Sequence, residues 1–405
     1  MNISRTEMFY SLKTNYELPV LRTINSQDVG VEVYRKAELA IALSAGFKGK
    51  DIIMDGPCKS RDDLEAALSS NVSLINAESW DEIALLNEMA GARGMIQPIG
   101  IRVNPGIRQS LNLFNYAAIR HSKPFGFDQD ELGDLFVNIT NMKNVKLSCI
   151  LVHMSIPVVS PKIFIKRIEL LFRAADQARR TGHPVDRIDL GGGYPSDEVI
   201  RLNLPSIIGN NPFFSFFQKV NREGIVGELG KAISKTYKEY AKKYSFEPKL
   251  VMEPGRYLVD DAMIVVGRIV EVKGKTVLTD ISGVTEVGYQ PHFSPRKVTI
   301  ANGENSPPCR TYKICGPTML PFDFIATNVR CQKISRGDII VVHNVGAYCT
   351  SSSKPFMLPR CACYFVDRSS TVHLSRRKET YRDMIDTQED LISDIRTPFK
   401  LYDRR

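Results

Sequence analysis

The stretch FYSLKTN, residues 9–15, opens with a short apolar run and reaches Lys13 just before a Thr-Asn pair. Similar apolar, β-branched runs recur up to about residue 260 and alternate with longer amphipathic segments. Strands that alternate with helices in this way are typical of parallel β/α units, so the pattern that begins at FYSLKTN predicts such units. Lys13 then ends the first strand, a position where a lysine is usually only solvated.

Eight runs have the length and composition of buried strands. They are FYSLK (9–13), VGVEV (29–33), IIMDG (52–56), SLINA (73–77), IGIRVN (99–104), LSCILVHM (147–154), RIDLGG (187–192) and LVMEPG (250–255). Several of the amphipathic segments between them close with glycine, a common residue at helix C-termini. Eight units of this kind predict an α/β fold, a (β/α)8 TIM-type barrel over residues 1–260, rather than an open sheet.

The pattern changes after about residue 260. Segments such as MIVVGRIVEVKG, KTVLTDIS, RKVTIAN, CRTYKICG, GDIIVVHNVGAY and RCACYFVD are rich in β-branched residues and are separated by turns. They predict a C-terminal antiparallel β domain over residues 261–405. A long gap at 195–249, with a predicted helix over 232–244, indicates an insertion or an enlarged crossover before the eighth strand.

Composition narrows the functional classes. The chain of 405 residues is 43% hydrophobic and 24% charged, as in globular proteins. No apolar run approaches the roughly 20 residues that cross a bilayer, and no secretory signal is present, so we expect a cytoplasmic protein without a membrane segment. The eight scattered cysteines are expected to be reduced thiols, and we predict no metal site. The net charge is +9, but the lysines and arginines are spread along the chain and no nucleic-acid-binding motif accompanies them. A solvated surface is therefore favoured over a nucleic-acid interface.

Polar residues follow the predicted strands at the end where (β/α)8 barrels carry their working residues. These positions hold Lys13, Glu32, Lys59, Glu78, Arg102, Asn104, His153, Gly191, Gly192, Gly193, Glu253 and Arg256. A glycine run lets backbone N–H groups approach a phosphate, and a lysine amine can form a Schiff base with a carbonyl cofactor. A carboxylate can hold a heteroaromatic nitrogen protonated, and a histidine can stack on a planar ring. Together these groups predict a pyridoxal-phosphate site.

Motifs along nearly the whole chain resemble the fold-type III pyridoxal-phosphate decarboxylases, the family of diaminopimelate, ornithine and arginine decarboxylases. In order, they are YSLKTN, VEVYRKAEL, GPCKS, IRVNP, SKPFG, HMS, DLGGGYP, EPGRYLV, CGPTMLPFD and GAY. The resemblance implies pyridoxal 5'-phosphate as cofactor, an amino acid as substrate and decarboxylation as reaction. It also implies a homodimer with shared active sites, which the segment around GPTMLPFD completes.

The resemblance implies a role for each matched residue. Lys13 matches the Schiff-base lysine, Glu253 the partner of the pyridine nitrogen, and His153 the ring-stacking histidine. The implied phosphate contacts are Gly191, Gly192, Gly193, Gly255, Arg256 and Tyr348, and Glu32 stands where the family usually has aspartate near the lysine. Alanine racemases share the barrel but set an arginine against the pyridine nitrogen, so Glu253 favours decarboxylation over racemisation.

The substrate-side segment departs from the family pattern G-P-x-C-D/E-x-x-D. The cysteine implied in the protonation step is Met319, whose thioether cannot donate a proton. Leu320 replaces the acidic residue that would hold a distal amine, which predicts a substrate other than ornithine, lysine or diaminopimelate. Asp323 and Cys315, which lies four residues before Met319, are the further substrate-side candidates.

Three more departures leave alternatives open. Ser155 and Ile156 replace the glycine and the phosphate-binding serine of the family, and SKPFG carries an extra Pro124. Few residues precede Tyr10, so either the β domain closes differently or the start of the chain is missing.

An active decarboxylase of a non-standard amino acid is the leading hypothesis. The alternatives are a non-catalytic homologue that acts as a binding or regulatory protein and, behind it, an amino-acid racemase.

Overall fold

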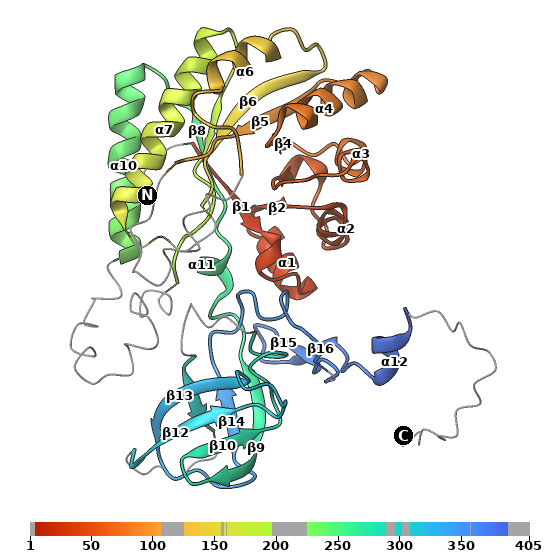
Figure 1. The fold of residues 1–405 in the computed structure, drawn as a ribbon, viewed down its shortest axis with the longest axis vertical. Coiled ribbons are helices and arrows are strands. Elements are labelled where there is room, and N and C mark those ends of the chain that lie inside the picture. The colour runs from red at the N-terminus through yellow and green to blue at the C-terminus, as the bar shows by residue number, and fades with distance from the viewer. Residues whose placement is uncertain are drawn as a thin grey trace, which may run out of the picture. The chain divides into compact units, whose positions relative to one another are not determined.

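In the computed structural model, eight parallel strands close into a barrel in which each strand pairs with the next and β8 pairs with β1 (Figure 1). They are β1 (Thr6–Ser11), β2 (Gly30–Val33), β3 (Ile52–Met54), β4 (Leu74–Ala77), β5 (Gln97–Arg102), β6 (Val145–Leu151), β7 (Arg187–Asp189) and β8 (Lys249–Met252). Each strand overlaps one of the eight predicted runs. The predicted (β/α)8 barrel is therefore confirmed.

The structure describes residues 5–106, 125–154, 158, 160–196, 225–288, 296–301, 308–356 and 358–387. Pro124, Ser155, Ile156 and most of the predicted insertion, residues 197–224, lie outside these ranges. The chain divides into two compact units, Met1–Ser353 and Lys354–Arg405. The expected domain boundary at residue 260 falls inside the first unit and stays a prediction.

Helices follow the strands and carry clear start signals. They are α1 (Leu18–Asn25), α2 (Lys36–Ser44), α3 (Arg61–Ser69), α4 (Trp80–Ala92), α6 (Leu132–Ile139), α7 (Pro161–Arg180), α10 (Ile225–Tyr244) and α11 (Arg256–Val259). Ser60 and Asp63 form a capping box at α3, and α7 starts with proline. The helix predicted over 232–244 is part of α10. None of the described helices has the length and apolar character needed to cross a membrane.

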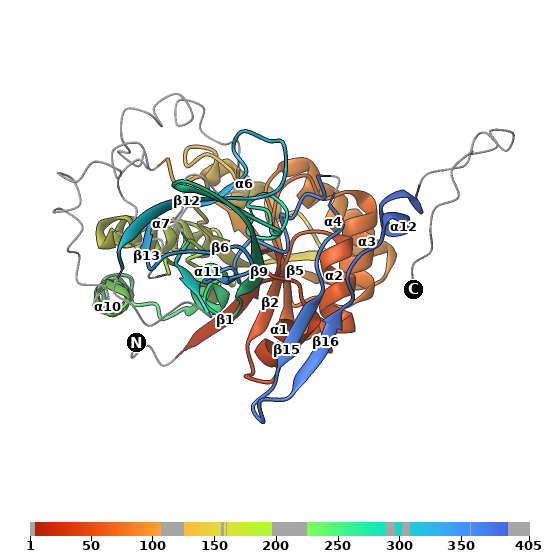
Figure 2. The same ribbon diagram turned by 90° about the horizontal axis from the view of Figure 1, so that it is seen from below.

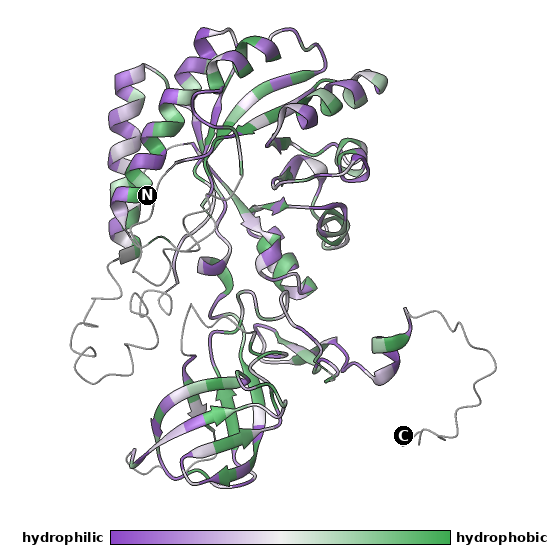
Figure 3. Ribbon diagram, in the orientation of Figure 1, coloured by the Kyte–Doolittle hydropathy of each residue, from purple (hydrophilic) through white to green (hydrophobic). Residues whose placement is uncertain are grey.

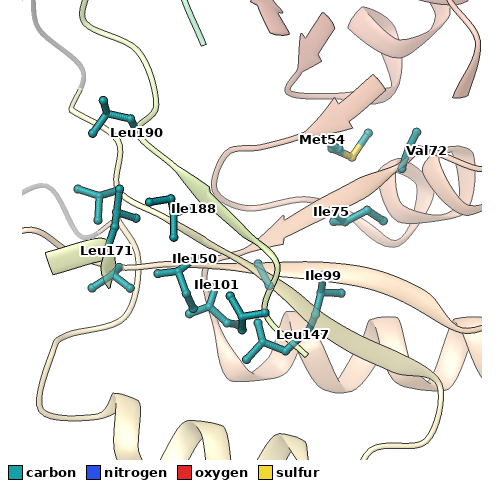
Figure 4. Close-up of a cluster of buried hydrophobic side chains, with 14 of the residues drawn as sticks. Met54, Val72, Ile75, Ile99, Ile101, Leu147, Ile150, Leu171, Ile188 and Leu190 are labelled. Carbon is teal, nitrogen blue, oxygen red and sulfur yellow. The ribbon is translucent and has the colours of Figure 1, made fainter. Parts of the chain in front are cut away.

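The main hydrophobic core lies between the outer face of the barrel and its helices. Figure 4 shows Leu171 of α7 close to Ile150 and Ile188, which point outward from β6 and β7. Figure 3 shows that α7 and α10 carry both hydrophobic and hydrophilic residues, as helices with one buried face do.

The inner face of the barrel holds a smaller apolar layer and then a polar one. The apolar layer consists of Phe9, Ile53, Leu74, Cys149 and Val251. Because successive side chains of a strand point to opposite faces, the residue two positions later on each strand also points inward. At four of these five positions that residue is polar, namely Ser11, Asp55, Asn76 and Glu253, and all four are buried. The alternation thus builds a polar floor at the C-terminal end of the barrel.

A six-stranded sheet follows the barrel within the first unit, in the order β11-β14-β9-β10-β12-β13. The strands are β9 (Val265–Lys273), β10 (Thr276–Thr279), β11 (Val298–Ile300), β12 (Arg310–Cys315), β13 (Phe324–Cys331) and β14 (Ile339–Val342). The predicted antiparallel pattern holds except that β10 and β12 pair in parallel. After β10 the chain passes through β11 at the far edge of the sheet, so β12 returns in the same direction as β10.

The second unit contains a two-stranded antiparallel sheet, visible as two adjacent arrows in Figure 2. Its strands are β15 (Cys363–Val366) and β16 (Val372–Arg376), and α12 (Tyr381–Ile385) follows them. The sequence pattern predicted β15 but neither β16 nor β13.

Candidate active site

Lys13 lies in a short 3-10 turn, η1 (Leu12–Thr14), directly after β1. The hydroxyl of Tyr10 donates to the carbonyl of Asn15 (3.1 Å). The side-chain amide of Asn15 donates to the carbonyl of Gly346 (2.8 Å). The N–H of Tyr348 donates to the carbonyl of Thr14 (2.8 Å). The motifs YSLKTN and GAY therefore meet in space, and together they fix the turn that presents Lys13.

A carboxylate from the neighbouring strand binds the lysine. The Nζ of Lys13 lies 2.8 and 2.7 Å from the two carboxylate oxygens of Glu32, and the Ser11 hydroxyl donates to the same carboxylate (2.6 Å). Burial lowers the pKa of Lys13, but the negative charges of Glu32, Tyr348 and Glu253 together outweigh it and raise the pKa above its ordinary value. Lys13 is thus held as an ammonium in this state.

Glu253 and His153 meet at the end of β8 and just beyond β6. The Nδ1 of His153 lies 2.9 Å from Oε2 of Glu253, whose other oxygen is buried and has no hydrogen-bond partner among the described residues. Burial, followed by repulsion from Asp189 and Asp55, raises the pKa of Glu253 well above its ordinary value. Burial also raises the pKa of Asp189, to about 7. The two carboxyl groups retain protons more strongly than free carboxylates do.

Asp55 and Asp189 are site residues that the sequence reasoning missed. Asp55 lies at the end of β3, 3.9 Å from Nη1 of Arg102, and one of its oxygens is buried without a partner among the described residues. Ligand atoms of Asp55, His153 and Glu253 lie within 4.8 Å of one another, a grouping that can also hold a metal ion. Both aspartates continue the inward alternation of their strands, and that signal could have identified them.

The glycine run forms a tight turn after β7. The N–H of Gly191 donates to Oδ1 of Asp189 (2.8 Å), and the N–H of Gly192 lies 3.3 Å from Nδ1 of His153. Gly191 has a φ of +62°, and a Cβ there would lie 2.9 Å from the Cα of His153. Glycine is therefore required at Gly191 by both backbone conformation and close packing.

The arginine of EPGR lies beside the GAY tyrosine. Arg256 is buried, its Nη1 donates to Oδ1 of Asp260 (3.2 Å), and its guanidinium lies 5.2 Å from the ring centre of Tyr348. Gly255 packs against Ser11 and Thr14 at the lysine turn. The structure thus brings the lysine, carboxylate, histidine, glycine and arginine candidates to one end of the barrel.

The substrate-side candidates lie at the end of β12 and in the loop that joins it to β13. Met319 is 95% exposed in the single chain, and Cys315 ends β12. Asp323 is buried, and its carboxylate accepts hydrogen bonds from Ser282 and Thr318 in addition to the N–H of Gly283. Asp323 thus fixes its own loop in this chain, and a substrate role for it and for Leu320 stays a prediction.

Two other strand-end candidates have structural contacts. The Nζ of Lys59 is fully buried and binds Oε1 of Glu82 (2.6 Å) and the carbonyls of Gly56 and Asn76. Arg102 binds Oε1 of Glu78 (2.5 Å) at the rim of the polar floor.

The polar floor suits a cationic heteroaromatic group. The buried carboxyl groups of Glu32, Asp55, Asp189 and Glu253 surround it, and in the described part of the chain Lys13 and Arg102 are the cations that pair with them. Because Glu253 and Asp189 retain protons in this state, a protonated ring nitrogen would stabilise the ionised form of Glu253 and could donate to its unpartnered oxygen. The glycine turn and Arg256 supply donors for an anion next to the same floor. These residues therefore fit pyridoxal phosphate.

Sequence comparison identifies the family. The model described as the pyridoxal-binding domain of pyridoxal-dependent decarboxylases matches residues 1–260, and that of their C-terminal sheet domain matches residues 256–346. The chain belongs to the pyridoxal-dependent decarboxylases. Its cofactor is accordingly pyridoxal phosphate, and the resemblance inferred from the motifs is confirmed.

Individual decarboxylases align over nearly the whole chain. The diaminopimelate decarboxylase of Archaeoglobus fulgidus is 26% identical and covers 95% of this chain and 87% of its own length. An L-glutamyl-(BtrI acyl-carrier protein) decarboxylase of Niallia circulans is 24% identical and covers 94% of this chain and 87% of its own length. The crystal structure of diaminopimelate decarboxylase from M. jannaschii superposes with a TM-score of 0.81 at 21% identity, covering 95% of this chain and 85% of that one.

Proposed function

We propose that this protein decarboxylates an amino acid at Cα, with pyridoxal phosphate held by Lys13. The observation that carries the proposal is the buried Glu253, with one free oxygen, at the same barrel end as Lys13. When bound, the cofactor supplies an electron-withdrawing ring that takes up the electron pair left when CO2 departs. Family membership supports this reaction class.

Each residue has a separate task in this proposal. Glu253 keeps the proton on the ring nitrogen, and His153 packs against the ring. Lys13 supplies the amine that bonds to the cofactor, and Glu32 holds that amine in place. The glycine turn, Gly255, Arg256 and Tyr348 bind the phosphate. We also propose that residues 1–260 and 261–405 act as two domains and that two copies complete each other's sites.

The proposed substrate has no free ammonium at its distal end. Leu320 offers an apolar side chain where the family places an acidic one, so a distal ammonium would lose its partner there. The relative from Niallia circulans supports this view, because its name describes a glutamyl group bound to a carrier protein as its substrate. An acylated or otherwise conjugated amino acid therefore fits better than lysine, ornithine, arginine or diaminopimelate.

The first test is the absorption spectrum of the full-length protein with pyridoxal phosphate, beside Lys13→Ala. We expect a visible band from the lysine-bound cofactor that the variant lacks. CO2 release is then measured across free basic, free acidic and conjugated amino acids. Turnover of free diaminopimelate or lysine at least as fast as any conjugated substrate contradicts the substrate proposal.

A non-catalytic binding protein is the second candidate, and Met319 favours it because a thioether cannot donate a proton. It predicts the visible band without CO2 release from any substrate of the panel. Absence of the band from a folded protein would exclude the assignment of Lys13.

A further inference from the structure

Arg167 is a charged residue on the buried face of α7, directly behind the glycine turn. Its side chain is fully buried, and its Nη1 donates to the carbonyls of Leu190 (3.2 Å) and Gly192 (2.9 Å). A buried guanidinium is rare unless a carboxylate pairs with it. The described residues place no carboxylate in ion-pair contact with Arg167, and its Nε and Nη2 have no hydrogen-bond partner among them.

Aromatic rings hold the guanidinium against the turn. Arg167 lies 4.8 Å from the ring centre of Phe164, which stacks on Tyr194 at 5.3 Å. Tyr194 follows the three glycines directly. Burial lowers the pKa of Arg167 to about 10, so the side chain keeps its positive charge at neutral pH. The described residues therefore place a positive charge without a counter-charge on the α7 side of the turn.

The carbonyls of the turn are all bound within the fold. Those of Leu190 and Gly192 accept from Arg167, that of Gly191 accepts from the N–H of Glu253 (3.1 Å), and that of Gly193 from the N–H of Val158 (2.8 Å). In a trans peptide unit the C=O and the following N–H point in opposite directions. Fixing the carbonyl of Gly192 on Arg167 therefore directs the N–H of Gly193 away from the helix.

We infer that Arg167 is a positioning residue for the phosphate of the cofactor. It orients the peptide unit between Gly192 and Gly193 so that the N–H of Gly193, rather than the carbonyl of Gly192, faces the anion, and the positive charge of Arg167 lies behind that peptide unit. The anion is in turn the missing counter-charge of the guanidinium. The inference rests on the proposed function only in assigning the phosphate to this turn.

The test compares two ligands that differ only in the phosphate. Pyridoxine 5'-phosphate and pyridoxine have no aldehyde, so their binding does not depend on a bond to Lys13. Dissociation constants are measured by equilibrium dialysis for the wild-type chain, Arg167→Met, Arg167→Lys and Arg167→Gln. Arg173→Met is the matched control, because Arg173 lies on the exposed side of the same helix.

We expect Arg167→Met to weaken binding of the phosphorylated ligand by about tenfold to a hundredfold, the effect of losing hydrogen bonds from a charged donor. Pyridoxine binding should change by less than about twofold, and Arg173→Met should match the wild type. Arg167→Lys, which keeps the charge, should retain more of the preference than Arg167→Gln. If Arg167→Met does not fold, as judged by circular dichroism, the Lys and Gln variants provide the same comparison.

Two results would overturn the inference. Equal losses for both ligands would mean that Arg167 only supports the fold, and an unchanged preference would mean that it plays no part in phosphate binding. A wild-type chain that does not distinguish the two ligands would instead refute the assignment of the phosphate to this turn, and the inference with it. The failure of the site and the failure of Arg167 are thus separate outcomes.

Discussion

Lys13 and Glu32 form a two-pronged ion pair, with Nζ 2.8 and 2.7 Å from the two carboxylate oxygens. The pair joins the ends of two adjacent barrel strands. It means that the ionisation of the lysine depends on one carboxylate more than on any other group of the site.

Replacing Glu32 by Gln should lower the pKa of Lys13, because burial remains while the attraction is lost. Lys13, which is 37% exposed, should then react with an amine reagent at lower pH than in the wild type. Peptide mass spectrometry of the cofactor-free protein measures this, with Glu32→Asp as the variant that keeps the charge. Identical pH profiles for Glu32→Gln and the wild type would show that the carboxylate does not control the lysine.

The raised pKa of Asp189 predicts that the stability of the folded chain depends on pH. Its pKa is raised from 3.8 to about 7 in the folded chain, so the folded state binds a proton that the unfolded state has released. Its contribution to stability is full below about pH 4 and is lost as the pH rises through 7. Asp189→Asn should therefore make the cofactor-free protein more stable at pH 8 by about 2–4 kcal/mol and leave it nearly unchanged at pH 4.

Urea unfolding at several pH values measures the effect. The exposed Asp130→Asn is the control and should follow the wild type throughout. If the free energy of unfolding depends on pH in the same way in the Asp189→Asn variant and in the wild type, the carboxyl of Asp189 titrates normally.

Gly346 should tolerate no side chain. A Cβ there would lie 1.6 Å from the carbonyl of Val259, so Gly346→Ala must shift the backbone that binds Asn15. We expect a loss of about 2 kcal/mol or more in the free energy of unfolding. Gly227→Ala in α10, where a Cβ meets nothing within 4 Å, should be neutral or stabilise by about 0.5–1 kcal/mol. Equal effects of the two substitutions would contradict the packing argument.

Lys59 should act on stability rather than on chemistry. Lys59→Met leaves the buried carboxylate of Glu82 without its partner and should cost about 3–5 kcal/mol in denaturant unfolding. Removing both charges in Lys59→Met with Glu82→Leu should recover much of that loss. The exposed pair Arg61–Glu88 gives the control, since Arg61→Met should cost no more than about 0.5 kcal/mol. A stable Lys59→Met protein that has lost cofactor binding would reassign Lys59 to the site.

The sequence predicted the barrel well because eight short apolar, β-branched runs alternate with amphipathic segments, as the strands and helices of β/α units do. Lys13, Glu32, His153 and Glu253 could be found from their places at strand ends. Asp55 was missed because Lys59, just past the strand, was considered there instead and the inward alternation from Ile53 to Asp55 was not followed. Strand ends alone also could not separate Lys59, bound to Glu82, from Lys13.

Other features depend on long-range packing. Arg167 interrupts the apolar face of an amphipathic helix, a signal that shows an unusual buried cation but not its partner. The parallel pairing of β10 with β12 follows from the path through β11, which local patterns do not record. The sequence analysis missed β13 of the six-stranded sheet and β16 of the two-stranded sheet, because local patterning did not mark them as separate elements.

The hydrogen bonds from the Asn15 amide to the Gly346 carbonyl and from the Tyr348 N–H to the Thr14 carbonyl tie the lysine turn to residues more than 330 positions later in the chain. At a translation rate of about 5–20 residues per second, these partners are synthesised on the order of tens of seconds after the turn itself. A nascent chain that already contains all eight barrel strands still lacks them. Cofactor capture should therefore be a late event of biosynthesis, and ribosome-stalled chains that end before residue 346 should hold the cofactor more weakly than chains that extend past residue 353.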